Sequence, residues 1–200
     1  MEELYGFRDG FSYEFPSQII VDLTEICNLG CTHCPHPVFK KSVHYSSRYL
    51  EQELNKKLVD EVREQGKGLC KYIRYTSNGE PLIHPKGYEL IKYAVENSNT
   101  FVCLTTNGTI MKEKKTKQLL DSGIHMIDIS IDAFKPETYA KIRVGGNLDV
   151  TRENVLRLIR WIKERDLKTK VVVSFVEQPE NTDEVADFEK YWNEQGADYV

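Results

Sequence analysis

Three cysteine residues, Cys27, Cys31 and Cys34, stand close together directly after the apolar run Ile19–Val21. Thiolates grouped this tightly are typical of a metal site, and cysteine thiolates are the ligands that hold iron–sulfur clusters. A cluster of four irons usually takes four cysteines. Three cysteines would leave one iron without a protein ligand, and catalysis at a metal needs such an open coordination position. The spacing therefore predicts a catalytic iron–sulfur site.

A structural zinc site is the alternative that the same residues leave open. Three thiolates and one imidazole, from His33, His36 or His44, can bind zinc in tetrahedral geometry. The chain would then be a zinc-stabilised binding module without redox chemistry. The two alternatives differ in metal content, because only the first predicts a brown protein that contains iron and sulfide.

Composition excludes several other classes of protein. The 200 residues are 40% hydrophobic and 29% charged, and the net charge of −4 argues against a dedicated nucleic-acid-binding protein. No apolar run approaches the length of a membrane span, and the start, Met1–Tyr5, lacks the pattern of a secretory signal. An odd number of cysteines, five, fits a reducing compartment, so we expect a cytoplasmic protein.

The metal site has to be positioned by alternating strands and helices. Short β-branched strands are predicted at 18–24, 71–76, 101–105, 126–131 and 171–176. Helical periodicity is found between them, at about 48–65, 88–95, 112–122 and 151–165, with further helices opened by Pro136 and by Asn181 or Thr182. Ser46 or Ser47 is the expected N-cap of the first helix. This alternation predicts βαβ units with a parallel sheet.

The predicted fold is α/β, a partial (β/α)6 barrel of the TIM type with parallel strands and outer helices. Five units are complete, and Asp198–Val200 is the expected start of a sixth strand, so the barrel is apparently truncated there. A complete eight-fold barrel typically needs about 250 residues. Residues 1–17 are expected to be an irregular lead-in, and residues 18–200 to be one core domain that is incomplete at its C-terminus. The alternative for Asp198–Val200 is a disordered tail.

Two motifs together resemble the signature of the radical S-adenosylmethionine (radical SAM) enzymes. The first is Cys-x3-Cys-x2-Cys directly after a strand, and the second is Gly79-Glu80-Pro81, which looks like that family's Gly-Gly-Glu-Pro motif. Ser77-Asn78 departs from the pattern, because glycines are common at these positions in the family. The resemblance covers about residues 18–200, and around Glu137–Gly146 it is most similar to members of the SPASM type, which carry auxiliary clusters.

The resemblance implies a definite chemistry. A 4Fe–4S cluster on the three cysteines would bind SAM at its open iron and cleave it reductively to a 5′-deoxyadenosyl radical. That radical would abstract hydrogen from an unidentified substrate, which could be a peptide, a sugar or another small metabolite. The expected partners are this substrate and a one-electron reductant such as a flavodoxin or ferredoxin. No side chain is assigned as a catalytic acid or base.

Residues near the C-terminal ends of the strands are the expected SAM contacts, because the site of an α/β barrel lies there. The resemblance and these positions together give His33, Gly79, Glu80, Asn107, Ser130, Asp132, Arg143 and Ser174. Gly79 would let its backbone approach the amino group of SAM, and Arg143 would pair with the SAM carboxylate. Simpler interpretations stay open for several of them: a loop histidine, a surface turn, an exposed helix arginine, or a small core residue. Cys70 and Cys103 are expected to be free buried thiols.

Overall fold

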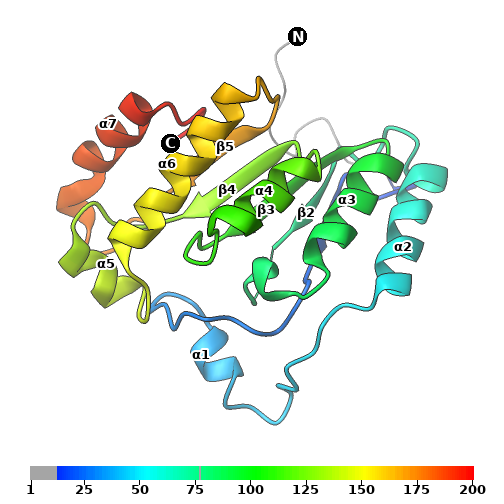
Figure 1. Cartoon of the computed structure of the whole chain (residues 1–200). Helices are drawn as coiled ribbons and strands as arrows, with labels where there is room; N and C mark the ends of the chain where they lie inside the picture. Colours follow the sequence, from blue (N-terminus) through cyan, green and yellow to red (C-terminus); the bar gives the residue numbers. More distant parts are fainter. Residues whose placement is uncertain (1–12, 77) are drawn as a thin grey trace.

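The computed structural model describes residues 13–76 and 78–200, and within them five parallel strands form one sheet (Figure 1). The strands are β1 (Gln18–Val21), β2 (Tyr72–Tyr75), β3 (Phe101–Thr106), β4 (Met126–Ser130) and β5 (Lys170–Ser174). Their order in the sheet is their order in the chain. Because crossovers between parallel strands are right-handed, this consecutive order keeps the connecting helices on one face, as in a barrel. The predicted parallel α/β architecture is confirmed.

Helices connect the strands and cover one face of the sheet. They are α1 (His36–Phe39), α2 (Gln52–Glu61), α3 (Gly87–Asn97), α4 (Glu113–Asp121), α5 (Pro136–Ile142), α6 (Leu148–Glu164) and α7 (Val185–Gln195). Figure 1 shows α3, α4 and α6 side by side in front of the strands, while α1 lies at the lower end of the view and α5 at its left side. None of the helices described is long and apolar enough to cross a membrane.

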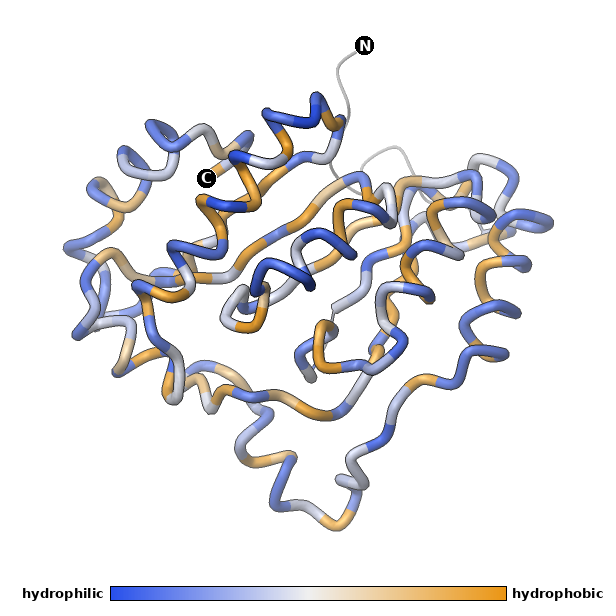
Figure 2. The backbone as a smooth tube through the Cα atoms, viewed as in Figure 1, coloured by the Kyte–Doolittle hydropathy of each residue, from blue (hydrophilic) through white to orange (hydrophobic). Residues whose placement is uncertain are grey.

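The hydrophobic core fills the space between the helices and the sheet. Alternate strand residues point into it, because side chains alternate between the two faces of a strand. Ile73 and Tyr75 of β2, for example, are fully buried. Figure 2 shows hydrophobic residues along the strands and on the inner sides of the helices, with hydrophilic residues on the outer sides. One face of the sheet therefore packs against the helices, and the opposite face carries polar side chains.

The first long helix begins later than the sequence predicted. It begins at Gln52, after the N-cap Glu51, and not near residue 48. Tyr49 instead pairs with Thr24 in an antiparallel bridge, and the N–H of Leu50 donates to the carbonyl oxygen of Leu23 at 2.9 Å. Pairing with the segment after β1 thus replaces the first helical turn. Neither Ser46 nor Ser47 is the N-cap, so that prediction is wrong.

The sequence also predicts the structure of the two ends of the chain. Asp198–Val200 was expected to begin a sixth strand, and Tyr199 does pair with Val172 of β5 in a parallel bridge. The lead-in predicted at 1–17 lies mostly outside the described residues. Within its described part, Phe15 is buried in the core and packs against Gly66.

Candidate active site

The loop that carries the three cysteines follows β1 and lies at the C-terminal edge of the sheet. Two backbone hydrogen bonds tie it to the end of α5: the N–H of Gly30 donates to the carbonyl oxygen of Val144 at 2.9 Å, and that of Thr32 to Ile142 at 3.0 Å. The loop is therefore anchored to a segment more than a hundred residues later in the chain. This anchoring brings the cysteines beside the residues that follow β4.

The chemistry of the three thiols fits a bound cluster. Cys27, Cys31 and Cys34 are all free. Burial raises the pKa of Cys27 to about 11, and burial also raises the pKa of Cys31 although the guanidinium of Arg143 opposes the shift. Such thiols stay protonated at neutral pH by themselves. A metal bound to them would displace the protons, since a coordinating thiol is deprotonated.

The zinc alternative finds less support in the geometry. In the part of the chain that the structure describes, no three Cys, His, Asp or Glu side chains converge on one metal-ion position. The Nε2 atom of His36 lies 2.8 Å from the carbonyl oxygen of Glu25, and His33 contacts Asp132 and Gln178. A cluster of four irons is wider than a single ion, so its thiolate ligands stand further apart. The donor set therefore suits the cluster better than zinc.

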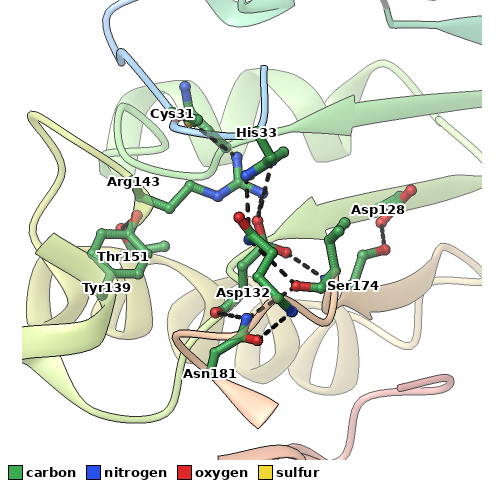
Figure 3. Close-up of polar contacts among 12 residues, drawn as sticks. Cys31, His33, Asp128, Asp132, Tyr139, Arg143, Thr151, Ser174 and Asn181 are labelled. Atoms are coloured by element: carbon green, nitrogen blue, oxygen red, sulfur yellow. Dashed lines mark hydrogen bonds and ion pairs between the residues drawn. The ribbon is translucent and has the colours of Figure 1, made fainter. Parts of the chain in front are cut away.

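A buried ion pair lies beside the cysteine loop (Figure 3). A terminal nitrogen of Arg143 lies 2.5 Å from the carboxylate of Asp132, and the other points at the Sγ atom of Cys31 at 3.6 Å. Asp132 also accepts a hydrogen bond from the backbone N–H of Val176 at 2.8 Å, and its carboxylate is 3.5 Å from His33. Arg143 is only 6% exposed, so it is not an exposed helix arginine.

The guanidinium of Arg143 can donate more hydrogen bonds than these contacts use. Its Nε–H is buried and has no hydrogen-bond partner among the described residues. A planar guanidinium donates in pairs and suits a carboxylate ligand. The group therefore lies where it can donate to a cluster ligand on one side and to a bound carboxylate on the other.

The imidazole of His33 is partly exposed, and its Nε2 atom lies 3.5 Å from the carboxylate of Asp132. Burial is the main cause that lowers its pKa, with Arg143 adding to the shift and Asp132 opposing it. The structure thus brings together His33, Asp132 and Arg143, three of the residues named from the sequence as expected SAM contacts.

Glu80 has a role in the fold that the sequence did not reveal. Its buried carboxylate accepts hydrogen bonds from the hydroxyl of Thr106 at 2.6 Å, from the backbone N–H of Asn107 at 2.8 Å and from that of Leu82 at 3.1 Å. It therefore joins the loops that follow β2 and β3. Because its oxygens accept these three hydrogen bonds, Glu80 positions the loops that carry the site.

Glu80 should make stability depend on pH. Burial raises the pKa of its carboxyl, although the three hydrogen bonds oppose the shift. The folded chain then binds this proton more tightly than the unfolded chain, so the free energy of unfolding falls as pH rises from the ordinary glutamate range through the raised pKa. We expect Glu80→Gln to remove that part of the pH dependence. Urea unfolding of both proteins at several pH values measures it, and parallel pH profiles would contradict the assignment.

Asn107 connects the cysteine loop to β3. Its side-chain N–H2 donates to the Oδ1 atom of Asn28 at 3.0 Å and lies 4.0 Å from the Sγ atom of Cys27. Its Oδ1 accepts from the backbone N–H of Thr109 at 3.0 Å. Asn107 therefore lies beside one predicted cluster ligand, Cys27.

Gly79 makes a close approach to protein backbone. A Cβ atom added there would lie 1.8 Å from the carbonyl oxygen of Thr24 and 2.9 Å from that of Ile26. The missing side chain thus lets the loop after β2 pack against the start of the cysteine loop. The described geometry explains this glycine by packing within the chain, whereas the sequence suggested an approach to SAM.

Gly79→Ala should therefore disturb the fold as well as the site. The added methyl group cannot be accommodated without moving backbone, so we expect a loss of stability of about 2 kcal/mol or more, in the upper part of the usual range for single substitutions. Gly30→Ala is the matched control, because a Cβ there meets its nearest neighbour at 3.9 Å. Thermal unfolding of both variants measures the difference, and equal melting temperatures would contradict the packing role.

Ser130 and Ser174 are register partners at the ends of β4 and β5. The hydroxyl of Ser174 donates to the carboxylate of Asp128, which also accepts from Arg74 at 3.2 Å and from Thr105 at 3.3 Å. These side chains form a polar layer on the face of the sheet opposite the helices. Sequence reasoning missed Asp128 and Arg74; the signal that could have found them is a charge at alternate positions of otherwise apolar strands.

Asn181 is a third residue that the sequence did not single out for the site. Its side-chain N–H2 donates to the carbonyl oxygens of Asp132, at 2.8 Å, and of Val176, at 2.9 Å. Asp132 itself has a φ of +64°, which is uncommon for a residue with a side chain. The amide of Asn181 thus holds the backbone turn that aims the Asp132 carboxylate at Arg143. Ser77, which was discussed with Gly79, lies outside the described residues.

Comparison with known proteins gives a consistent result. A family model described as the radical SAM superfamily matches residues 21–191. A GTP 3′,8-cyclase of Lactiplantibacillus plantarum is 29% identical over 195 residues, which are 96% of this chain and 54% of that protein. A probable GTP 3′,8-cyclase of Methanococcus maripaludis is 31% identical over 159 residues, 80% of this chain and 48% of that protein. The chain thus spans about half the length of the curated relatives it matches.

Solved structures share the fold. Streptococcus suis SuiB bound to S-adenosylmethionine matches with a TM-score of 0.72 at 15% identity, over 93% of this chain and 40% of that one. Native anSMEcpe with bound AdoMet matches with a TM-score of 0.65 at 22% identity, over 91% of this chain and 49% of that one. Both likenesses support the partial barrel.

Proposed function

Because the chain belongs to the radical SAM superfamily, whose members use a 4Fe–4S cluster and SAM, we propose that Cys27, Cys31 and Cys34 hold the cluster and that the strand ends hold SAM. When bound, these cofactors supply a 5′-deoxyadenosyl radical through reductive cleavage of SAM, and the radical abstracts hydrogen from a substrate. The observation that carries the proposal is the buried guanidinium of Arg143, which lies between a cysteine sulfur and the Asp132 carboxylate.

The chain's own residues bind and orient SAM, support the cysteine loop and shield the site from water. Arg143 donates toward the sulfur of Cys31 and offers its remaining N–H donors to the SAM carboxylate, while Asp132 fixes its direction. Asn107 supports the cysteine loop beside Cys27. The backbone of Gly79 and the hydroxyl of Ser130 complete the SAM contacts. Hydrogen bonds to cluster sulfurs and exclusion of water are the means by which a protein tunes such a cofactor.

His33, Glu80 and Ser174 contribute in different ways. His33 is partly exposed and contacts the adenosine side of SAM. Glu80 and Ser174 support the site through their bonds to Thr106 and Asp128. We assign no catalytic acid or base among them. We place the reaction in the cytoplasm, where free thiols stay reduced.

GTP is the substrate that we propose first. The support is the name of the curated relatives, GTP 3′,8-cyclase, in two organisms at 29% and 31% identity. A peptide is the second candidate, because one matching structure is SuiB bound to its precursor peptide SuiA. The polar layer around the Asp128–Arg74 pair lies on the face of the sheet opposite the helices and offers hydrogen-bonding groups to either substrate.

The experiment is anaerobic turnover of the iron-loaded protein with SAM and dithionite, with and without GTP. We expect 5′-deoxyadenosine to form, and GTP to accelerate it and to be converted to a new product. Formation of 5′-deoxyadenosine without any effect of GTP would reject the substrate and keep the radical chemistry. Failure to form 5′-deoxyadenosine by protein with a full cluster would contradict the proposed function itself.

A further inference from the structure

The segment that carries the cysteines differs in charge from the rest of the chain. Residues 26–50 contain no acidic residue, whereas the whole chain contains 31 and has a net charge of −4. The same segment has three basic residues, Lys40, Lys41 and Arg48. Arg48 pairs with Glu25 at 2.9 Å, while Lys40 and Lys41 are exposed and form no ion pair within the described residues. The segment therefore carries net positive charge in a chain whose net charge is negative.

Two apolar side chains accompany the lysines on the surface. Val38 is 75% exposed and Val43 is 95% exposed, which is far more than the chain's other valines show. Val38, Lys40, Lys41 and Val43 lie within six positions of one another at α1 and the turn after it. We call these four residues the basic surface. Apolar groups among charges of one sign are what a transient protein partner contacts.

Packed aromatic side chains support the loop that carries the basic surface. Phe39 and Tyr45 meet edge to face with ring centroids 5.6 Å apart, and His36 contacts Tyr45 at 6.2 Å. His36 is 2% exposed and its ring bonds to the carbonyl oxygen of Glu25 at 2.8 Å. The loop thus has a defined shape, and its exposed residues are held outward.

The basic surface is also close to a predicted cluster ligand. The backbone N–H of His36, the first residue of α1, donates to the Sγ atom of Cys34 at 3.4 Å. Val38 follows within one helical turn, a rise of about 5.4 Å. Figure 1 shows α1 and the following turn projecting from the lower end of the molecule, away from the helical layer. A protein bound there would reach the cluster by a short path through Cys34.

We propose that the basic surface docks a small acidic one-electron carrier protein of the flavodoxin type, which supplies the electron for the cluster. The inference rests on the proposed function. In the step, the carrier is oxidised by one electron and the cluster is reduced by one electron, and no covalent bond forms or breaks. The small area of the surface fits, because electron-transfer encounters are weak and bury under about 1,200 Å². Opposite charges would steer the carrier to the loop.

The test uses the holoenzyme and a purified bacterial flavodoxin as the probe. Lys40→Glu/Lys41→Glu is the variant, and Lys114→Glu/Lys117→Glu on α4 is the control, because these lysines are also exposed and the charge change is equal. Anaerobic calorimetry at low salt gives the affinity. We expect the first variant to bind flavodoxin about 10-fold more weakly or worse and the control to bind it as the wild type does, with wild-type affinity falling as salt rises.

Turnover then separates docking from chemistry. The flavodoxin-driven rate of 5′-deoxyadenosine formation should fall about in step with affinity in the Lys40→Glu/Lys41→Glu variant, while the dithionite-driven rate stays unchanged. An unchanged affinity, an equal loss in the control, or a loss of the dithionite-driven rate would overturn the proposal. If wild-type protein makes no 5′-deoxyadenosine with dithionite, the proposed function fails, and the affinities alone still decide whether the carrier docks here.

Discussion

Replacing any one of Cys27, Cys31 or Cys34 with Ala is expected to abolish the cluster. Each would supply one of only three protein ligands, so its loss opens a second iron to solvent and exchange. We expect iron and acid-labile sulfide, measured on anaerobically reconstituted protein, to fall from about four of each per chain to a small remainder. The brown colour should disappear with them.

The matched controls are the two other cysteines. The Sγ atom of Cys70 faces the carbonyl oxygen of Tyr72 at 3.7 Å, and that of Cys103 faces Ile73 at 3.6 Å, so both thiols are satisfied away from the cysteine loop. Cys70→Ala and Cys103→Ala should retain full iron content. Loss of iron in either control would show that the ligand assignment is wrong.

Arg143→Leu is expected to give the second large effect, this time on stability. Removing the guanidinium leaves the fully buried carboxylate of Asp132 without its charged partner. Breaking a buried pair from one side typically costs about 3–5 kcal/mol, because the remaining charge stays desolvated. Urea unfolding at neutral pH measures the loss. Asp132→Asn in the Arg143→Leu background should recover part of it, since the unpaired charge is then removed.

Arg160→Leu is the control for this second prediction. Arg160 lies on α6, its side chain is 61% exposed, and it pairs with Glu164 at 3.8 Å. Exposed pairs of this kind contribute about 0–1 kcal/mol. Similar losses in Arg143→Leu and Arg160→Leu would mean that the pair beside Cys31 is not buried in solution.

The strands and most helices were predictable because one local signal dominates each of them. The run predicted as a strand at 171–176 begins with three valines that favour a buried strand, and β5 covers its first four residues, Val171–Ser174. The periodicity of α6 leaves one apolar face. The first long helix was mispredicted at its start, where Tyr49 and Leu50 pair with the segment after β1. Such a contact depends on residues about 25 positions away, and no local pattern contains it.

The site was predictable where residue type alone restricts the chemistry. Three closely spaced cysteines allow few interpretations, and the position of Asp132 after a strand placed it at the correct edge. The orientation of each side chain was not predictable. Arg143 could have been an exposed helix residue, and its burial follows from Asp132 and from the bonds between the cysteine loop and the end of α5. Glu80 had the same ambiguity, because the partners of its carboxylate lie in the next loop of the barrel.

Low-temperature electron paramagnetic resonance of the reduced, anaerobically prepared protein, recorded before and after SAM is added, tests the central claim most directly. The account predicts a signal from a reduced 4Fe–4S cluster whose shape changes with SAM, because SAM binds the iron that Cys27, Cys31 and Cys34 leave open. A colourless, zinc-containing protein with no signal would contradict it. So would a cluster signal that SAM leaves unchanged.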